Sequence, residues 1–240
     1  MKFVFIPIFF YSLLAADNML AQSPADSTRS VSIRQMIIGG EKALGENSIL
    51  FSGREYTGYD RQFKGEPYFI SDSMNAGSVW YNGLCFRDIP MLYDILNDNL
   101  IILSFLKDTR ICLASERTDS FRLLGHSFIR ILTDSSQPQP IPSGFYDEIY
   151  PGKTAVLIRR WKTGIMPIDP GQPPRYIQRT AWFIKKKDLY YPVHSKKEFF
   201  ALLADKRKQV LKYLRSQNLK YRKDPELTMS RAAEYYDLLN

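Results

Sequence analysis

Between residues 45 and 193, short runs of aromatic and β-branched residues alternate at close spacing with Gly, Asn, Asp and Pro. Short runs separated by turn residues are typical of antiparallel strands. Residues 78–81 and 84–86 flank Asn82 and Gly83, the dipeptide that two-residue hairpins favour most. The pattern therefore predicts an antiparallel β domain over residues 45–193, with a roll or barrel-like sheet. Further strands are expected at 91–96, 100–103, 110–114, 121–124, 127–132, 154–161, 179–185 and 189–193.

The pattern changes at Ser195. Ser195 and Glu198 form a capping box, in which hydroxyl and carboxylate oxygens accept hydrogen bonds from free N–H groups at a helix start. Apolar residues then recur at helical spacing to about residue 217. Asp224 and Pro225 suit the N-cap and the first position of a second helix. Residues 194–240 are therefore predicted to form a basic helical hairpin packed on the β domain. The fold class is α+β, mainly antiparallel β.

The first residues have the composition of a secretory signal peptide. Lys2 precedes a short apolar run, and small residues follow at Ala15, Ala16 and Ala21. The run is shorter than the roughly 20 apolar residues that span a bilayer. We expect residues 1–21 to be a cleaved signal and 22–44 to be a leader segment. The mature protein is then exported, periplasmic or secreted, and not transmembrane.

Two cysteines, Cys85 and Cys112, lie in apolar, strand-like runs. In an oxidising compartment such a pair can form a disulfide, but spacing alone does not show that the two sulfurs meet. Free cysteines are also common in buried strands. The sequence leaves both states open.

Positive charge is concentrated in one part of the chain. The net charge is +8, yet residues 150–223 alone carry 19 Lys or Arg against 4 Asp or Glu. Export disfavours nucleic acid, so an anionic lipid, an acidic glycan or an acidic protein surface is the expected partner. The alternative is a solvated face that keeps the protein soluble. The densest runs, and the predicted binding residues, are Lys185, Lys186, Lys187, Lys206, Arg207 and Lys208.

Catalytic motifs are hard to find. The two histidines, His126 and His194, belong to no group with metal-ligand spacing, and no serine lies in a Gly-x-Ser-x-Gly motif. Asp147 and Glu148, flanked by tyrosines, are the most site-like cluster, although the alternation of a strand explains them equally well. We predict no catalytic, cofactor or metal site. The sequence does not decide whether the protein is an enzyme, and the missing motifs favour a protein that is not.

Several segments resemble a known group of proteins. They are Trp-Tyr-Asn-Gly at 80–83, Met-Leu-Tyr-Asp at 91–94, Tyr-Tyr-Pro-Val at 190–193, Ser-Lys-Lys-Glu at 195–198 and Glu-Tyr-Tyr-Asp-Leu at 234–238. Together they resemble uncharacterised exported proteins of Bacteroidetes-type bacteria, a resemblance that implies a Gram-negative periplasm and no particular activity. The leading hypothesis is a non-enzymatic envelope protein that binds an anionic partner through its basic carboxyl-terminal region. A β-barrel carrier of a small apolar or sugar ligand is the alternative, and a hydrolase comes third.

Overall fold

The computed structural model describes residues 49–240, except 60–62, 105–108, 137–140 and 170. The predicted signal peptide and the whole predicted leader segment lie outside the described residues and stay predictions. The strands are β1 (Arg54–Glu55), β2 (Asn75–Tyr81), β3 (Leu84–Asp94), β4 (Asn99–Leu103), β5 (Arg110–Cys112), β6 (Thr118–Leu123), β7 (His126–Ile131), β8 (Gly144–Tyr150), β9 (Thr154–Ile165), β10 (Arg175–Lys186) and β11 (Leu189–Val193). The helices are α2 (Lys196–Leu202), α3 (Arg207–Ser216) and α4 (Pro225–Leu238).

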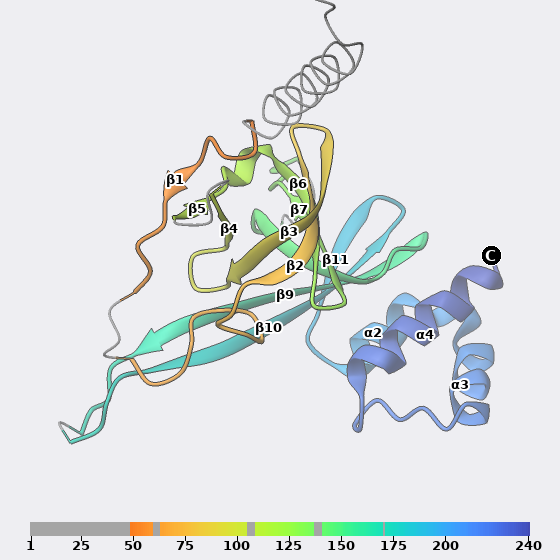
Figure 1. Ribbon diagram of the computed structural model, residues 1–240. Helices are drawn as coiled ribbons and strands as arrows, with labels where there is room; N and C mark the ends of the chain where they lie inside the picture. The colour runs from red at the N-terminus through yellow and green to blue at the C-terminus, as the bar shows by residue number, and fades with distance from the viewer. Residues whose placement is uncertain (1–48, 60–62, 105–108, 137–140, 170) are drawn as a thin grey trace, which may run out of the picture. The chain divides into compact units, whose positions relative to one another are not determined.

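The described strands form one antiparallel sheet in the order β1-β5-β4-β3-β2-β6-β7-β8-β9-β10-β11. Among the described residues, the α-helices all follow the last strand, so the predicted fold class, α+β and mainly antiparallel β, is confirmed. Figure 1 shows the long β9–β10 hairpin and, in blue, the three helices that end the chain.

The predicted β2–β3 hairpin is present. Its turn residues Asn82 and Gly83 have φ values of 52° and 75°, the left-handed conformations of a type I′ turn. Two strands predicted at 84–86 and 91–96 are instead one strand, β3. Asp88, at a φ of 55°, lies where the register with β2 shifts, so a bulge carries the strand past this point. Strand β8 was not among the predicted strands, and it contains the Asp147–Glu148 pair.

An aromatic core covers one face of the sheet. Phe121 and Phe128 stack with ring centroids 4.7 Å apart, and Tyr93 packs edge-on against both at 5.0 and 4.9 Å. Phe69 and Phe145 extend the cluster, and all five rings are buried. Edge-to-face and offset-stacked rings are favourable beyond their burial. These rings fill the space next to β3, β6, β7 and β8.

A second core joins the helices to β9, β10 and β11. Val156, Ile184 and Val193 of these strands pack with Phe199 and Leu203 from the first helical turns. The neighbouring residues on the strands, such as Leu157 and Phe183, belong to a separate cluster. Because side chains alternate across a strand, both faces of this part of the sheet are buried.

The capping box at Ser195 is confirmed. Ser195 Oγ accepts a hydrogen bond from the Glu198 N–H at 3.2 Å, and the Glu198 carboxylate accepts one from the His194 N–H at 2.8 Å. At the later helix, the Asp224 carboxylate accepts from the Leu227 N–H at 2.9 Å, with Pro225 at the first position. Both predicted helix starts are therefore in place.

The first predicted helix is divided in two. Helix α2 ends at Leu202, a short 3-10 turn follows at Ala204–Lys206, and α3 begins at Arg207. The Leu202 carbonyl accepts a hydrogen bond from Lys186 Nζ of β10 at 2.8 Å. This bond satisfies a carbonyl that a helix end leaves free, and so favours ending the helix there. The sequence contains no signal for it, because the partner comes from a distant strand.

We expect Ser195→Ala to lower the free energy of unfolding by about 1 kcal/mol, because the Glu198 N–H loses its acceptor. Urea unfolding measures the change. Ser216→Ala is the matched control, since that hydroxyl only donates to the Tyr213 carbonyl at an exposed helix end. An unchanged urea midpoint for Ser195→Ala would show that the cap is not needed.

The same cap depends on pH. Hydrogen bonds from the His194 N–H and the Ser195 hydroxyl hold the pKa of Glu198 below its usual value. A lowered folded-state pKa means that the contribution of Glu198 is present above its unfolded-state pKa and is lost as pH falls through the folded-state value. The effect of Ser195→Ala should therefore shrink in acid.

Two points raised by the sequence, the state of the cysteines and the crossing of a membrane, are addressed by the described residues. Cys85 is exposed and Cys112 is buried, and both are free thiols. None of the helices within the described residues combines the length and the apolar character that crossing a bilayer requires.

Candidate functional site

The two predicted basic runs meet in space. Lys186 Nζ donates to the Tyr236 hydroxyl at 2.7 Å, and this hydroxyl donates to the Asp205 carboxylate at 2.9 Å. Partial desolvation raises the pKa of Asp205, but the Tyr236 hydrogen bond and the positive charges of Lys186 and Lys206 bring it below its ordinary value. Residues 185–187 and 206–208, far apart in the sequence, therefore lie on either side of one polar contact.

The three consecutive lysines have three different environments. Lys186 is half-buried and holds β10 to the helices, so it is a structural residue. Lys185 pairs with Asp188 at 3.2 Å. Lys187 is exposed in the turn between β10 and β11, at a φ of 51°. Of this run, Lys187 is the one whose charge is most available to a partner.

Helix α3 carries the most regular array of exposed cations. Arg207, Lys208, Lys212 and Arg215 are all exposed, and the helix contains no acidic residue. Lys208, Lys212 and Arg215 are spaced i, i+4 and i+7, which places them on one stripe of the helix. We call these four residues the basic surface. Lys212 and Arg215 were not among the predicted binding residues, although their helical spacing from Lys208 would have identified them.

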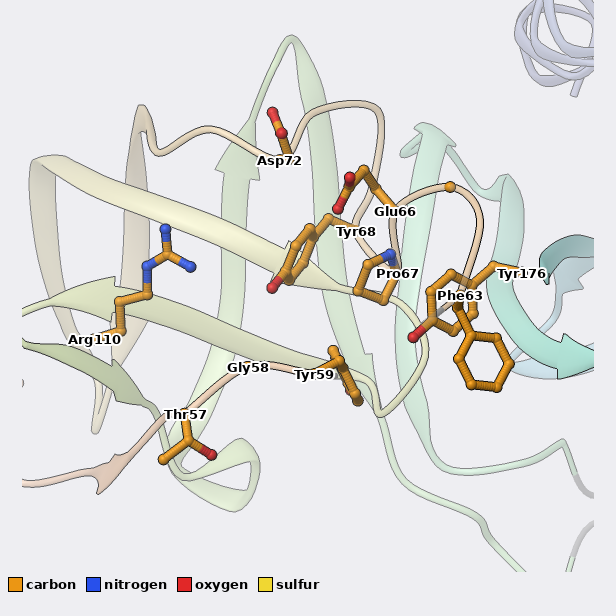
Figure 2. A pocket seen from close by; sticks show the side chains of 11 residues that line it. Thr57, Gly58, Tyr59, Phe63, Glu66, Pro67, Tyr68, Asp72, Arg110 and Tyr176 are labelled. Carbon is orange, nitrogen blue, oxygen red and sulfur yellow. The ribbon is translucent and has the colours of Figure 1, made fainter. Parts of the chain in front are cut away.

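A cleft with a volume of about 640 Å³ lies elsewhere, beside β3 and β5 and the amino end of β10 (Figure 2). The sequence did not predict it, because the loop that lines most of it has no regular pattern. Only the fold brings Arg110 and Tyr176 to this loop. The described lining residues are Thr57, Gly58, Tyr59, Phe63, Gly65, Glu66, Pro67, Tyr68, Asp72, Arg110 and Tyr176. We call it the tyrosine-lined cleft.

Behind the cleft, the phenols of Tyr56 and Tyr59 converge on the fully buried Asp94 at the end of β3. The Asp94 carboxylate accepts from both hydroxyls and from the backbone N–H groups of residues 96 and 97. Burial, followed by side-chain hydrogen bonding, raises the pKa of both phenols far above the usual value. Both hydroxyls therefore stay protonated.

The aromatic wall of the cleft is held in place by backbone pairing. Phe63 and Tyr176 stack with centroids 4.8 Å apart, and Tyr59 meets Tyr176 edge-on at 6.4 Å. The Lys64 N–H donates to the Pro174 carbonyl at 2.7 Å, and the Tyr176 N–H donates to the Lys64 carbonyl at 3.2 Å. The loop is thus paired to the start of β10.

A charged network lies between the two cores. Asp147 is 1% exposed, and its Oδ2 contacts His126 Nδ1 at 2.8 Å and an Arg160 nitrogen at 3.0 Å. Arg160 also donates to Glu226 of α4 at 2.9 Å. The most site-like pair of the sequence is thereby divided: Asp147 joins this network, while Glu148 lies on the other face of the strand.

A histidine–aspartate contact also occurs in hydrolases, where the aspartate orients the imidazole. Here Arg160 binds the same carboxylate oxygen, so the negative charge is shared with a permanent cation. The contacts link strands β7, β8 and β9 to helix α4. We therefore interpret the network as structural, and not as a means of activating His126 as a base. Among the described residues, no three His, Cys, Asp or Glu side chains are grouped so that they could hold a metal ion.

Comparisons with protein-family models, with curated proteins and with solved structures find no match for this chain. The function is therefore inferred from the contacts and charges described above.

Proposed function

We propose that this is a non-enzymatic exported envelope protein that binds an anionic surface through the basic surface of α3. The observation that supports it is the uniform charge of this helix: four exposed cations and no acid between Arg207 and Ser216. Lys187 and Lys206 flank the same region through the Lys186–Tyr236–Asp205 contact.

The basic surface has a fixed orientation. Val210 and Leu214, on the opposite side of α3, are buried in the helical core, and Tyr213 stacks on Tyr235 of α4 at 4.2 Å. The helix therefore cannot turn its apolar side toward a membrane without leaving its core. Binding through this surface is electrostatic, and salt should weaken it because mobile ions screen exposed charges.

The placement of the cations also disfavours a purely stabilising role. Arg207 and Lys208 begin α3, where the positive end of the helix dipole repels cations, and no acidic side chain lies in the first turn. Lys208 and Lys212 repel each other at i, i+4 spacing. Each arrangement lowers the stability of the helix slightly. A bound anionic partner would reduce both repulsions. Local rules are most often broken at functional sites.

The triple variant Lys208→Glu, Lys212→Glu and Arg215→Glu should abolish binding to vesicles that contain anionic phospholipid. Each basic residue near such a surface contributes about 1 kcal/mol, so the loss of three weakens binding on the order of 100-fold. Co-sedimentation with vesicles at low and high salt measures this. The parent protein should bind at low salt and be released at high salt.

The matched control reverses three exposed cations of the β region, Arg87, Lys153 and Arg179, with the same change in net charge. It should bind like the parent. Equal loss in both variants would mean that only net charge matters, and the basic surface would then be a solvated face. Binding to an acidic polysaccharide or an acidic protein but not to vesicles would replace lipid with that partner.

A further inference from the structure

We propose that the tyrosine-lined cleft is a carbohydrate-binding site that takes a short, uncharged oligosaccharide. The cleft shares no residue with the basic surface, so this inference does not depend on the proposed function. It also lies outside the aromatic core, and is therefore not the enclosed interior that a β-barrel carrier would use.

The size and the rings of the cleft suit a sugar. Its volume of about 640 Å³ falls within the roughly 300–1,000 Å³ of typical ligand pockets. Tyr59, Phe63 and Tyr176 supply aromatic surface at one end, and in Figure 2 Arg110 lies toward the other end. The C–H groups of a sugar ring pack on such rings.

The polar groups of the cleft include both hydrogen-bond acceptors and a hydrogen-bond donor. Glu66 and Asp72 are exposed carboxylates that accept hydrogen bonds from sugar hydroxyls, and Arg110 is an exposed donor. An apolar ligand would leave these groups without partners when it displaced their water. An anionic ligand would face two carboxylates, and a cationic one would face Arg110. A neutral, hydroxyl-rich molecule matches all three side chains.

Hydrogen bonds within the chain hold the cleft in shape. Lys162 Nζ of β9 donates to the Glu66 carbonyl at 2.5 Å and to the Tyr68 carbonyl at 2.7 Å. These two bonds hold the lining loop at Glu66 and Tyr68 against β9. Asn97 Nδ2 donates to the Tyr59 hydroxyl at 2.6 Å, which fixes that ring. Side chains fixed by internal hydrogen bonds lose little conformational entropy when a ligand binds. The same contacts with the ligand then give a higher affinity.

The test is isothermal titration of the full mature chain with a panel of neutral glucose-, mannose- and N-acetylglucosamine-based oligosaccharides. At least one member should bind. Tyr176→Ala should weaken that binding about tenfold or more, which corresponds to roughly 1.4 kcal/mol. Asp72→Asn, a substitution at an exposed position that keeps the shape of the side chain, should also weaken sugar binding. This variant keeps the test valid if Tyr176→Ala does not fold.

Tyr213→Ala is the matched control, because it removes one ring of a stacked pair outside the cleft. It should leave sugar binding unchanged. High salt should also leave sugar binding unchanged while releasing the protein from anionic vesicles, so the two proposals fail separately. The inference is overturned if no sugar of the panel binds at millimolar concentration, or if both cleft variants bind like the parent.

Discussion

Arg160→Met should lower the free energy of unfolding by about 3 kcal/mol, because it leaves the buried Asp147 without its permanent cation. Methionine retains most of the apolar stem of arginine. The loss of stability therefore measures the missing charge more than any change in packing. His126 remains hydrogen-bonded to the same carboxylate and compensates in part. Glu226 is partly exposed and regains water. These two effects place the expected loss at the lower end of the range for broken buried pairs.

Thermal unfolding provides the measurement, and the expected fall in Tm is roughly 6–12 °C for a domain of this size. Arg231→Met is the matched control on α4. Its partner Glu234 lies at 2.8 Å, but both side chains are exposed, so the pair contributes little. If the two variants lose the same stability, the Asp147 network behaves as a surface pair and its structural role is refuted.

Phe128→Ala should have an even larger effect, about 4 kcal/mol, since it removes a ring from the middle of the aromatic core. Phe128 is 1% exposed and contacts Phe69, Tyr93 and Phe121, with centroids 4.7 to 5.1 Å apart. Three rings would lose a partner at once, and none can move into the space without leaving its own contacts. A residual cavity adds to the lost burial.

Chemical denaturation of Phe128→Ala and Phe128→Leu separates the two contributions. Leucine keeps most of the apolar volume, so its cost should be about 1–2 kcal/mol. A loss of the same size for both variants would mean that the neighbouring rings collapse freely. The core would then be less tightly packed than the ring contacts indicate.

Much of the fold follows from local signals in the sequence. Asn82 and Gly83 specify a turn whose twist suits a hairpin, and Ser195 and Asp224 each supply an oxygen to a helix start. Such signals act over two to four residues, so a single chain reveals them. Strand β8 has no hairpin dipeptide before it, which is why it was missing from the predicted strands, although strand alternation was one explanation of Asp147 and Glu148.

The sites depend on contacts between distant residues. Three adjacent lysines look alike in the sequence, yet Lys186 is held by Leu202 and Tyr236 while Lys187 is exposed. The tyrosine-lined cleft needs Arg110 and Tyr176, which lie far from its loop in the chain. The exposed stripe of α3 is the exception, because helical spacing alone places Lys212 and Arg215 beside Lys208.

The order of the strands bears on how this sheet is assembled. In the described sheet, every pairing except β1 with β5 and β2 with β6 joins strands that follow one another in the chain. Consecutive strands meet after closing a short loop, which costs little entropy, whereas the return of β6 to β2 encloses β3, β4 and β5. Rates of folding rise as contacts become more local. Despite its eleven strands, the sheet can therefore find its register mostly by short-range pairing, with one long-range closure at β2 as the step that joins its two halves.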